Sequence, residues 1–301
     1  MRILCAVDGS DYAQWGVASL EALAEREPQH VTLLHVIDTS ALKAAAGKNP
    51  IAARRAQAAL EKAGARLLRE AERAARVALG QATTAPRTTF HRLLAHGALA
   101  STIARQAART RADLIVMGSR GLSDIQGFLL GSLSRQVAAV TPCPILVIKR
   151  PTQRFGQIIL AVDASKQSRA AARFLRAHLV SDTSQVTILS SVDSPISDLA
   201  ARYLSESQQA ELIEPALTHA QHLVQALRTD FIKEGIPVST KVTVNHVIAS
   251  IVQHVEARQP DLLVLGARPL TKSERLHLGS VSESLLRHAP CSVLIVRGAR
   301  A

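Results

Sequence analysis

The sequence predicts an α/β protein made of two tandem doubly wound domains, each with a five-stranded parallel sheet and helices on both faces. Three observations lead to this prediction. The chain has 301 residues, which suits two domains of about 150 residues each. Short β-branched runs alternate with longer Ala-, Leu- and Arg-rich segments of helical period, the pattern of strands buried on both faces and the helices that connect them. The second half of the chain also repeats the first.

Four sequence blocks recur in the same order in the two halves. Residues 3–10, Ile-Leu-Cys-Ala-Val-Asp-Gly-Ser, return at 158–165 as Ile-Ile-Leu-Ala-Val-Asp-Ala-Ser. The other matched pairs are 31–38 with 186–193, 113–118 with 261–266, and 141–148 with 289–296. We therefore predict a duplication whose seam lies at 149–157, with one domain at 1–150 and the other at 151–301.

The apolar runs give the strands in chain order, and helices fill the gaps between them. The expected strands are 2–8, 31–37, 88–94, 113–118 and 144–149 in the first half, and 157–162, 186–192, 237–244, 261–266 and 292–297 in the second. Ser10 and Ser165 follow the first strand of each half, where each can cap a helix. Pro142 and Pro290 end the last helices. Such a sheet binds ligands beyond the carboxyl ends of its strands.

Composition argues against a base-stacking nucleic-acid binder, a membrane-spanning protein and a secreted protein. Apolar residues make up 47% of the chain and aromatic residues only 3%, which favours helices packed on sheets over a surface that stacks nucleic-acid bases. The sequence has no apolar window near the roughly 18 residues of a membrane span, and its start does not resemble a signal peptide. Its three cysteines show no C-x-x-C spacing. We therefore expect a cytoplasmic protein without a transmembrane segment or metal site.

The net charge of +12 is concentrated in one segment. Residues 43–76 hold nine basic and three acidic side chains in an Ala-rich stretch of helical character. Its arginines at 66, 69, 73 and 76 form a stripe, which is either a solvated helix face or a surface for a partner, an acidic lipid or nucleic acid. Nucleic acid is not expected, because no interleaved aromatic residues accompany the stripe.

A glycine-rich loop follows the fourth predicted strand. It has the pattern Gly118-x2-Gly121-x9-Gly131-Ser132. Glycines free the backbone to approach a ligand and to adopt positive φ, and the exposed N–H groups of the next helix favour an anion. Arg120 is a further candidate, because a cation beside a phosphate loop stabilises the ligand electrostatically. The loop is therefore a candidate phosphate site.

These motifs together resemble the universal stress protein family over essentially the whole chain. The resemblance lies in the loop pattern above and in the runs Ala-Val-Asp-Gly-Ser at 6–10, Leu-His-Val-Ile-Asp at 34–38 and Pro-Cys-Pro-Ile-Leu-Val-Ile at 142–148. It implies an adenine nucleotide alpha hydrolase-like fold with strand order 3-2-1-4-5. It also implies two domains related by a pseudo-two-fold axis, with their final strands paired across it.

The resemblance further implies a nucleotide site in the first domain. The adenine would lie between the first and second strands, against Ala6, Asp8 and the backbone of Val36. The ribose and phosphates would contact Met117, Gly118, Gly121, Gly131, Ser132 and Leu133.

The second half departs from this pattern at one position. Its loop keeps the spacing from Gly266 to Gly279 and Ser280, but Pro269 replaces the second glycine. Proline fixes φ and lacks a backbone N–H, so the second site is expected to be degenerate. Its weaker candidate residues are Asp163, Val192, Gly266, Gly279 and Ser280.

The sequence offers no clear catalytic set. No lysine follows the glycines as in a P-loop, so we expect a protein that is not an enzyme, with slow ATP hydrolysis left open. His219 and His222, three residues apart, lack a third metal ligand at suitable spacing and fit a polar helix face.

The expected function is a stress response in which the first domain binds ATP or a related adenine nucleotide, with Mg²⁺ left open, and a partner protein reads its occupancy. One alternative is a nucleotide-independent adaptor that binds a partner, lipid or nucleic acid through residues 43–76. A weak ATPase is the second alternative. The expected assembly is an intramolecular pseudo-dimer, and a further homodimer is left open.

Overall fold

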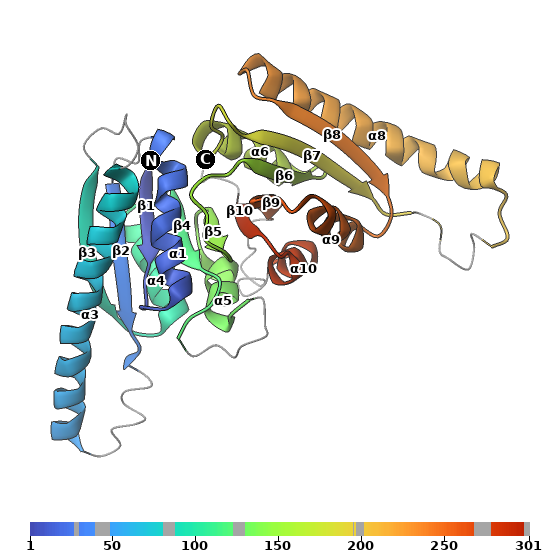
Figure 1. Cartoon of the computed structure of the whole chain (residues 1–301). Coiled ribbons are helices and arrows are strands. Elements are labelled where there is room, and N and C mark those ends of the chain that lie inside the picture. The colour runs from blue at the N-terminus through green and yellow to red at the C-terminus, as the bar shows by residue number, and fades with distance from the viewer. Residues whose placement is uncertain are drawn as a thin grey trace.

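The structure, a computed structural model, contains ten strands and the helices between them in its described part (Figure 1). It describes residues 1–26, 30–39, 49–80, 88–122, 130–194, 196, 202–267 and 278–297. The first half contains β1 (Arg2–Ala6), α1 (Asp11–Ala18), the 3-10 helix η1 (Ser19–Arg26), β2 (His30–Ile37), α3 (Pro50–Gly80), β3 (Thr89–His96), α4 (Leu99–Arg109), β4 (Leu114–Gly118), α5 (Ser132–Val140) and β5 (Ile145–Ile148). The second contains β6 (Gln157–Val162), α6 (Lys166–His178), β7 (Gln185–Val192), α8 (Glu206–Lys233), β8 (Val238–Val244), α9 (Val247–Arg258), β9 (Leu262–Ala267), α10 (Ser280–His288) and β10 (Ser292–Arg297). Each strand begins and ends within two residues of the position expected from the sequence.

The strands form one continuous sheet. Its order is β3-β2-β1-β4-β5-β10-β9-β6-β7-β8, so the first half has the predicted order 3-2-1-4-5 and the second half mirrors it. All neighbouring strands are parallel except β5 and β10, which pair antiparallel with Leu146 opposite Leu294. The expected pairing of the final strands is confirmed, and it joins two five-stranded sheets into one of ten strands.

Helices cover both faces of the sheet, as predicted. The buried residues of α1, α3, α6 and α8 pack on one face, and those of α4, α5, α9 and α10 pack on the other. Each of the two cores runs through both domains. The long helices α3 and α8 lie at opposite ends of the molecule (Figure 1).

The expected helix caps are present in both halves. The Ser10 hydroxyl accepts a hydrogen bond from Ala13 N at 3.1 Å, and the Ser165 hydroxyl accepts one from Ser168 N at 3.1 Å. Each cap satisfies one of the first N–H groups of a helix. The duplication therefore preserves the start of the first helix in both domains.

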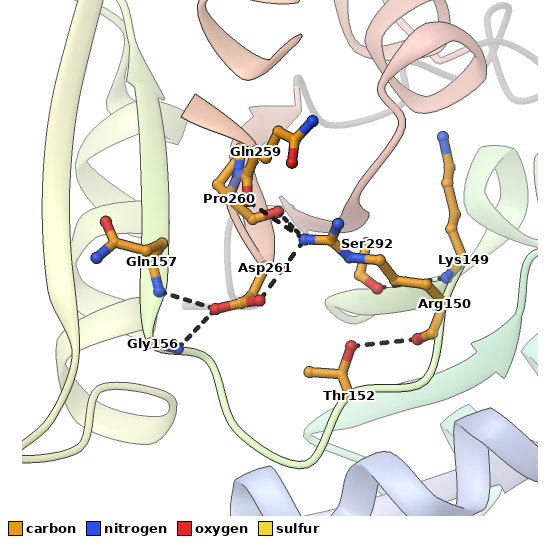
Figure 2. A network of polar contacts seen from close by, with 9 residues as sticks. All are labelled: Lys149, Arg150, Thr152, Gly156, Gln157, Gln259, Pro260, Asp261 and Ser292. Atoms are coloured by element: carbon orange, nitrogen blue, oxygen red, sulfur yellow. Dashed lines mark hydrogen bonds and ion pairs between the residues drawn. The ribbon is translucent and has the colours of Figure 1, made fainter. Parts of the chain in front are cut away.

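A network of polar contacts fixes the linker to the second domain (Figure 2). Asp261 Oδ2 accepts hydrogen bonds from the backbone N–H groups of Gly156 and Gln157, both at 2.9 Å. Arg150, a linker residue, lies 3.6 Å from Asp261 Oδ1 and donates to the carbonyl oxygen of Pro260. The start of β6 is thus held by the Asp261 carboxylate, which in turn lies beside Arg150 of the linker.

The first domain contains the counterpart of this network. Asp113, which matches Asp261, accepts from the Arg2 backbone N–H at 2.7 Å and from its guanidinium at 3.0 Å. These hydrogen bonds outweigh the effect of burial and lower the pKa of Asp113. The predicted boundary between 150 and 151 lies within the linker and remains a prediction.

Two buried cations cross the domain junction in opposite directions. Lys149, at the end of β5, donates through Nζ to the carbonyl oxygens of Leu286 and Ala289 at 2.6 and 2.5 Å. Arg297, its counterpart at the end of β10, donates through Nη2 to the carbonyl oxygen of Ala138 at 2.7 Å. Each cation binds carbonyl groups at the C-terminal end of the other domain's last helix, where the helix dipole favours positive charge. Burial lowers the pKa of Lys149 to about 8.

Candidate functional site

The predicted site residues of the first domain gather at the carboxyl ends of β1, β2 and β4. Ala6 and Met117 are partners in the pairing of β1 with β4. Val36 lies one residue before the end of β2, and Gly118 ends β4. Their backbone groups therefore lie at one edge of the sheet, the edge where doubly wound folds bind ligands.

Asp8 links this edge to the loop after β4. Its Oδ1 accepts hydrogen bonds from the Ser10 backbone N–H at 2.9 Å and from the Ser10 hydroxyl at 2.6 Å. Its Oδ2 accepts from the backbone N–H of Leu122 at 3.3 Å, across 114 residues of chain. The carboxylate thus positions the loop directly after Gly121, a role that residue spacing does not reveal.

Gly118 is required by the packing of a helix. A Cβ atom added at Gly118 would lie 2.5 Å from the carbonyl carbon of Tyr12 in α1 and 2.6 Å from its oxygen. The close approach at Gly118 is therefore to α1 rather than to a ligand. Gly131 has a φ of −76° as the N-cap of α5, so Gly131 and Ser132 open this helix, and positive φ is not what Gly131 supplies.

Among the described residues, no side chain caps the first turn of α5. Gly131 is the N-cap and makes no side-chain hydrogen bond there, and Ser132 is exposed as the first helical residue. Gly131 N donates to the carbonyl oxygen of Ser119 at 2.7 Å, which closes the loop onto the end of β4. Leu133 follows and is half-buried. The backbone N–H groups of this turn therefore keep their capacity to bind a negatively charged group.

Two residues that support this site were missed in the sequence analysis. The buried Ser134 hydroxyl lies 2.9 Å from the carbonyl oxygen of Gly118 and 3.0 Å from that of Ser119, so it ties α5 to the end of β4. The matching Ser282 lies 3.4 Å from the carbonyl oxygen of Gly266, and this repeated serine was the available signal.

The second missed residue is His35 on β2. Its Nδ1 lies 2.8 Å from the carbonyl oxygen of Val7 and fixes the chain between Ala6 and Asp8. The first domain has His35 where the second has Ser190.

Arg120 is directed toward α1. Its guanidinium carbon lies 5.2 Å from the centroid of the Tyr12 ring, within cation–π range. Its Nε is buried and has no hydrogen-bond partner among the described residues. A contact between Arg120 and a phosphate remains a prediction.

In the second domain, Asp163 bonds to Ser165 in its own turn and to Ser168 in the first turn of α6. Its Oδ1 accepts from the Ser165 backbone N–H at 3.0 Å and from the Ser168 hydroxyl at 2.6 Å. Burial would raise the pKa of Asp163, but these hydrogen bonds outweigh it and lower the pKa. The first domain has Gly9, with a φ of +91°, where the second has Ala164. The turn therefore has a different backbone in the two domains.

The scaffold of the second site is otherwise preserved. A Cβ atom at Gly266 would lie 2.5 Å from the carbonyl carbon of Gln167, which repeats the approach at Gly118. Gly279 is the N-cap of α10 without a side-chain hydrogen bond, and Ser280 is its first residue. Pro269 lies outside the described residues, so its effect remains a prediction.

Val192 does not match Val36 in the strand register. The hydrogen bond from Asn245 N to the carbonyl oxygen of Val192 has its counterpart in the one from Gly97 N to that of Ile37. The constant offset of 155 residues likewise pairs Val36 with Ser191. The weaker second site was therefore assigned one residue too far along β7.

The buried cysteines are poor nucleophiles. Burial raises the pKa of Cys5 to about 12, and those of Cys143 and Cys291 to about 11. Within the described ranges, no group of three or more His, Cys, Asp or Glu side chains is placed to hold a metal. Across the same ranges, no helix is both long and apolar enough to cross a membrane.

Comparisons with known proteins agree with this architecture. The family model described as the universal stress protein family matches residues 1–149 and 154–297. A universal stress protein from Thermus aquaticus is 33% identical over 147 residues, which cover 49% of this chain and 97% of that protein. Universal stress protein YxiE from Bacillus subtilis is 28% identical over 153 residues, which cover 49% of this chain and 98% of that protein.

A solved structure covers the chain from end to end. It is the crystal structure of a universal stress protein from Archaeoglobus fulgidus, 18% identical, with a TM-score of 0.68 over 98% of each chain. The fold is therefore that of tandem α/β domains of this type. The chain belongs to the universal stress protein family, with a domain of the family in each half.

Proposed function

We propose that this chain binds ATP or a related adenine nucleotide in its first domain, and that a partner protein reads its occupancy during the stress response. One observation carries the proposal: the first turn of α5, which no described side chain caps, follows a loop that Asp8 ties to the end of β1. An anion at α5 would thus lie at the same strand edge as Ala6 and Val36.

The arrangement suits a nucleotide because it offers two different surfaces. Backbone N–H groups of α5 and the exposed Ser132 hydroxyl would bind phosphate oxygens. The backbone near Ala6, Asp8 and Val36 would meet the base, as the family resemblance implies. A bound nucleotide would change the surface beside Leu122 and Ser132, and this change gives a partner protein something to recognise.

We propose that the protein is not an efficient enzyme. The Asp8 carboxylate already accepts three hydrogen bonds from Ser10 and Leu122, so it acts as a positioning group rather than as a free general base. Slow hydrolysis of ATP would then be a by-product of binding.

The adaptor function is a second candidate, supported by α3. The arginines at 66, 69, 73 and 76 are all exposed. Arg66 and Arg76 form ion pairs with Glu70 and Glu72, at 2.8 and 2.7 Å, whereas no ion pair of Arg69 or Arg73 occurs within the described ranges. Part of the basic stripe is thus available to an acidic partner. Lys43 and Lys48 lie outside the described residues.

Nucleotide binding can be tested directly. Protein purified gently is examined for copurified nucleotide by mass spectrometry, and ATP and ADP are titrated into it by calorimetry. Gly121→Pro should weaken binding at least about tenfold, a loss of about 1.4 kcal/mol, because it removes a backbone N–H and restricts the loop.

A matched pair of serines provides the control. Ser132→Ala should weaken binding severalfold, and Ser280→Ala, at the same position in the second domain, should leave it unchanged. Absence of any affinity would refute the proposed function while leaving the fold unaffected. Equal losses from the two serine variants would show that the site is not confined to the first domain.

A further inference from the structure

Three arginines of α6 share one face of the helix. Arg169, Arg173 and Arg176 follow the spacing i, i+4 and i+7, which aligns them along about 10 Å of helix axis. All three line a cavity between α6 and α8. The arrangement therefore places a row of guanidinium groups along one wall of a groove.

The groove has the size of a small-molecule site. Its volume is about 480 Å³, within the roughly 300–1,000 Å³ of typical ligand pockets. Leu223, Leu227 and Phe231 of α8 belong to its lining and are buried. His219 and His222 also line it, and an imidazole carries at least one N–H donor in either protonation state. The groove thus combines an apolar base with several hydrogen-bond donors.

Arg176 is held in place from one side. Its Nη1 lies 3.4 Å from Glu234 and 3.7 Å from Asp230, and its guanidinium carbon lies 5.6 Å from the centroid of the Phe231 ring. Its side chain is only 16% exposed. Its Nε is buried and has no hydrogen-bond partner among the described residues. Arg176 therefore contributes an anchored positive charge to the lining of the groove.

The other two arginines have no neutralising partner. Arg169 and Arg173 are exposed, and no acceptor for either side chain occurs within the described ranges. Among the described residues that line the groove, Asp230 is the only acidic one, and it already lies beside Arg176. The groove therefore keeps a net positive charge.

The first domain shows that packing does not require these charges. The constant offset of 155 residues pairs the three arginines with Gln14, Ala18 and Glu21. The caps that begin α1 and α6 are nevertheless the same. The duplicated scaffold thus packs this helix without a basic face, and the charge belongs to the second domain alone.

We propose that the groove between α6 and α8 is a second ligand site, which binds a small anion carrying two or more phosphoryl groups. Guanidinium groups recognise phosphate oxygens through paired hydrogen bonds. A row spread over about 10 Å favours an extended anion over a single phosphate ion. The site is separate from the proposed nucleotide pocket, because it lies between two helices rather than at the strand ends.

Inorganic tripolyphosphate is the probe for this site. It is titrated by calorimetry into the full-length chain, both wild type and Gly121→Pro, so that binding at the nucleotide loop is distinguished from binding in the groove. The groove variant is Arg169→Gln with Arg173→Gln. The control is Lys166→Gln with Arg228→Gln, which removes the same charge from exposed positions of α6 and α8 outside the cavity lining. Thermal unfolding confirms that each variant is folded.

The expected result is a site that Gly121→Pro retains and the groove variant weakens at least tenfold, with the control pair within twofold of its parent. ATP titrated into the same proteins shows whether a nucleotide's phosphate chain occupies the groove as well as the free anion. The proposal is overturned if Gly121→Pro binds no tripolyphosphate, or if the two charge-matched pairs lose affinity equally.

Discussion

The first turns of the two domains share an aspartate and a serine, but the two aspartates have different partners. Asp8 bonds to Leu122 in the loop after β4, whereas Asp163 bonds to Ser168 in the helix that follows it. Both turns cap their helix with a serine. Duplication has therefore preserved the cap that begins the helix and has changed the partners of the aspartate among the described residues, which do not include the second domain's loop at 268–277.

The two domains differ in a second way, on the α1 and α6 side of the sheet. The second domain carries Arg169, Arg173 and Arg176 where the first carries uncharged or acidic residues. The domain with the altered nucleotide loop is thus the one with the basic groove. The proposed nucleotide site and the proposed anion site thus fall in different domains.

The largest effect should come from a feature that the domains share. Gly118→Ala and Gly266→Ala should each lower the free energy of unfolding by about 3 kcal/mol or more, because the added Cβ would overlap backbone atoms of the first helix. Urea denaturation measures this loss. Gly80→Ala is the control, because a Cβ there meets nothing within 4 Å. A small loss at either strand glycine would mean that the helix can move away, and that the two scaffolds are not equivalent.

The two buried cations should differ in how their contribution to stability depends on pH. The pKa of Lys149 is lowered to about 8 from 10.5, so the unfolded chain binds more protons between these values, and the contribution of Lys149 to stability rises with pH across that window. The free energy of unfolding of the wild type, relative to Lys149→Met, should increase by up to about 3 kcal/mol between pH 8 and 10.5.

Arg297→Met provides the comparison for this pH effect. Burial lowers the pKa of Arg297, but an arginine retains its proton throughout this range. Its stability difference from the wild type should therefore stay flat from pH 8 to 10.5. Parallel denaturation series compare both variants with the wild type. A flat profile for Lys149→Met would refute the prediction.

A smaller effect should distinguish the two aspartates. Asp8→Ala should weaken adenine nucleotide binding about tenfold, or about 1.4 kcal/mol, because the loop loses its bond to the end of β1. Asp163→Ala should change the affinity less than twofold, because among the described residues its carboxylate bonds only to Ser165 and Ser168. Calorimetry with ADP measures both. Equal losses would show that Asp8 has no special connection to the loop.

Much of the fold could be predicted because its signals are local. Apolar runs mark the strands, and repeated residues such as Ser10 and Ser165 mark the helix starts. The pairing of β5 with β10 followed from the family resemblance. The partner of Asp8, the burial of Lys149 and the reason for Gly118 could not be predicted, since each depends on atoms more than 100 residues away or on the approach of a helix. The helical spacing of Arg169, Arg173 and Arg176 can be read from the sequence, but the sequence does not reveal that they face α8.

Lys149 and Arg297 each bind carbonyl groups of the other domain, and these contacts bear on how the two halves stay together. Each domain supplies a group that completes the last helix of the other, so the halves act toward each other as partner subunits. Two separate chains joined by the same strand edge would come apart on dilution. Here the short linker keeps the partner at a fixed effective concentration, so the tandem arrangement makes the pairing independent of how much protein the cell contains.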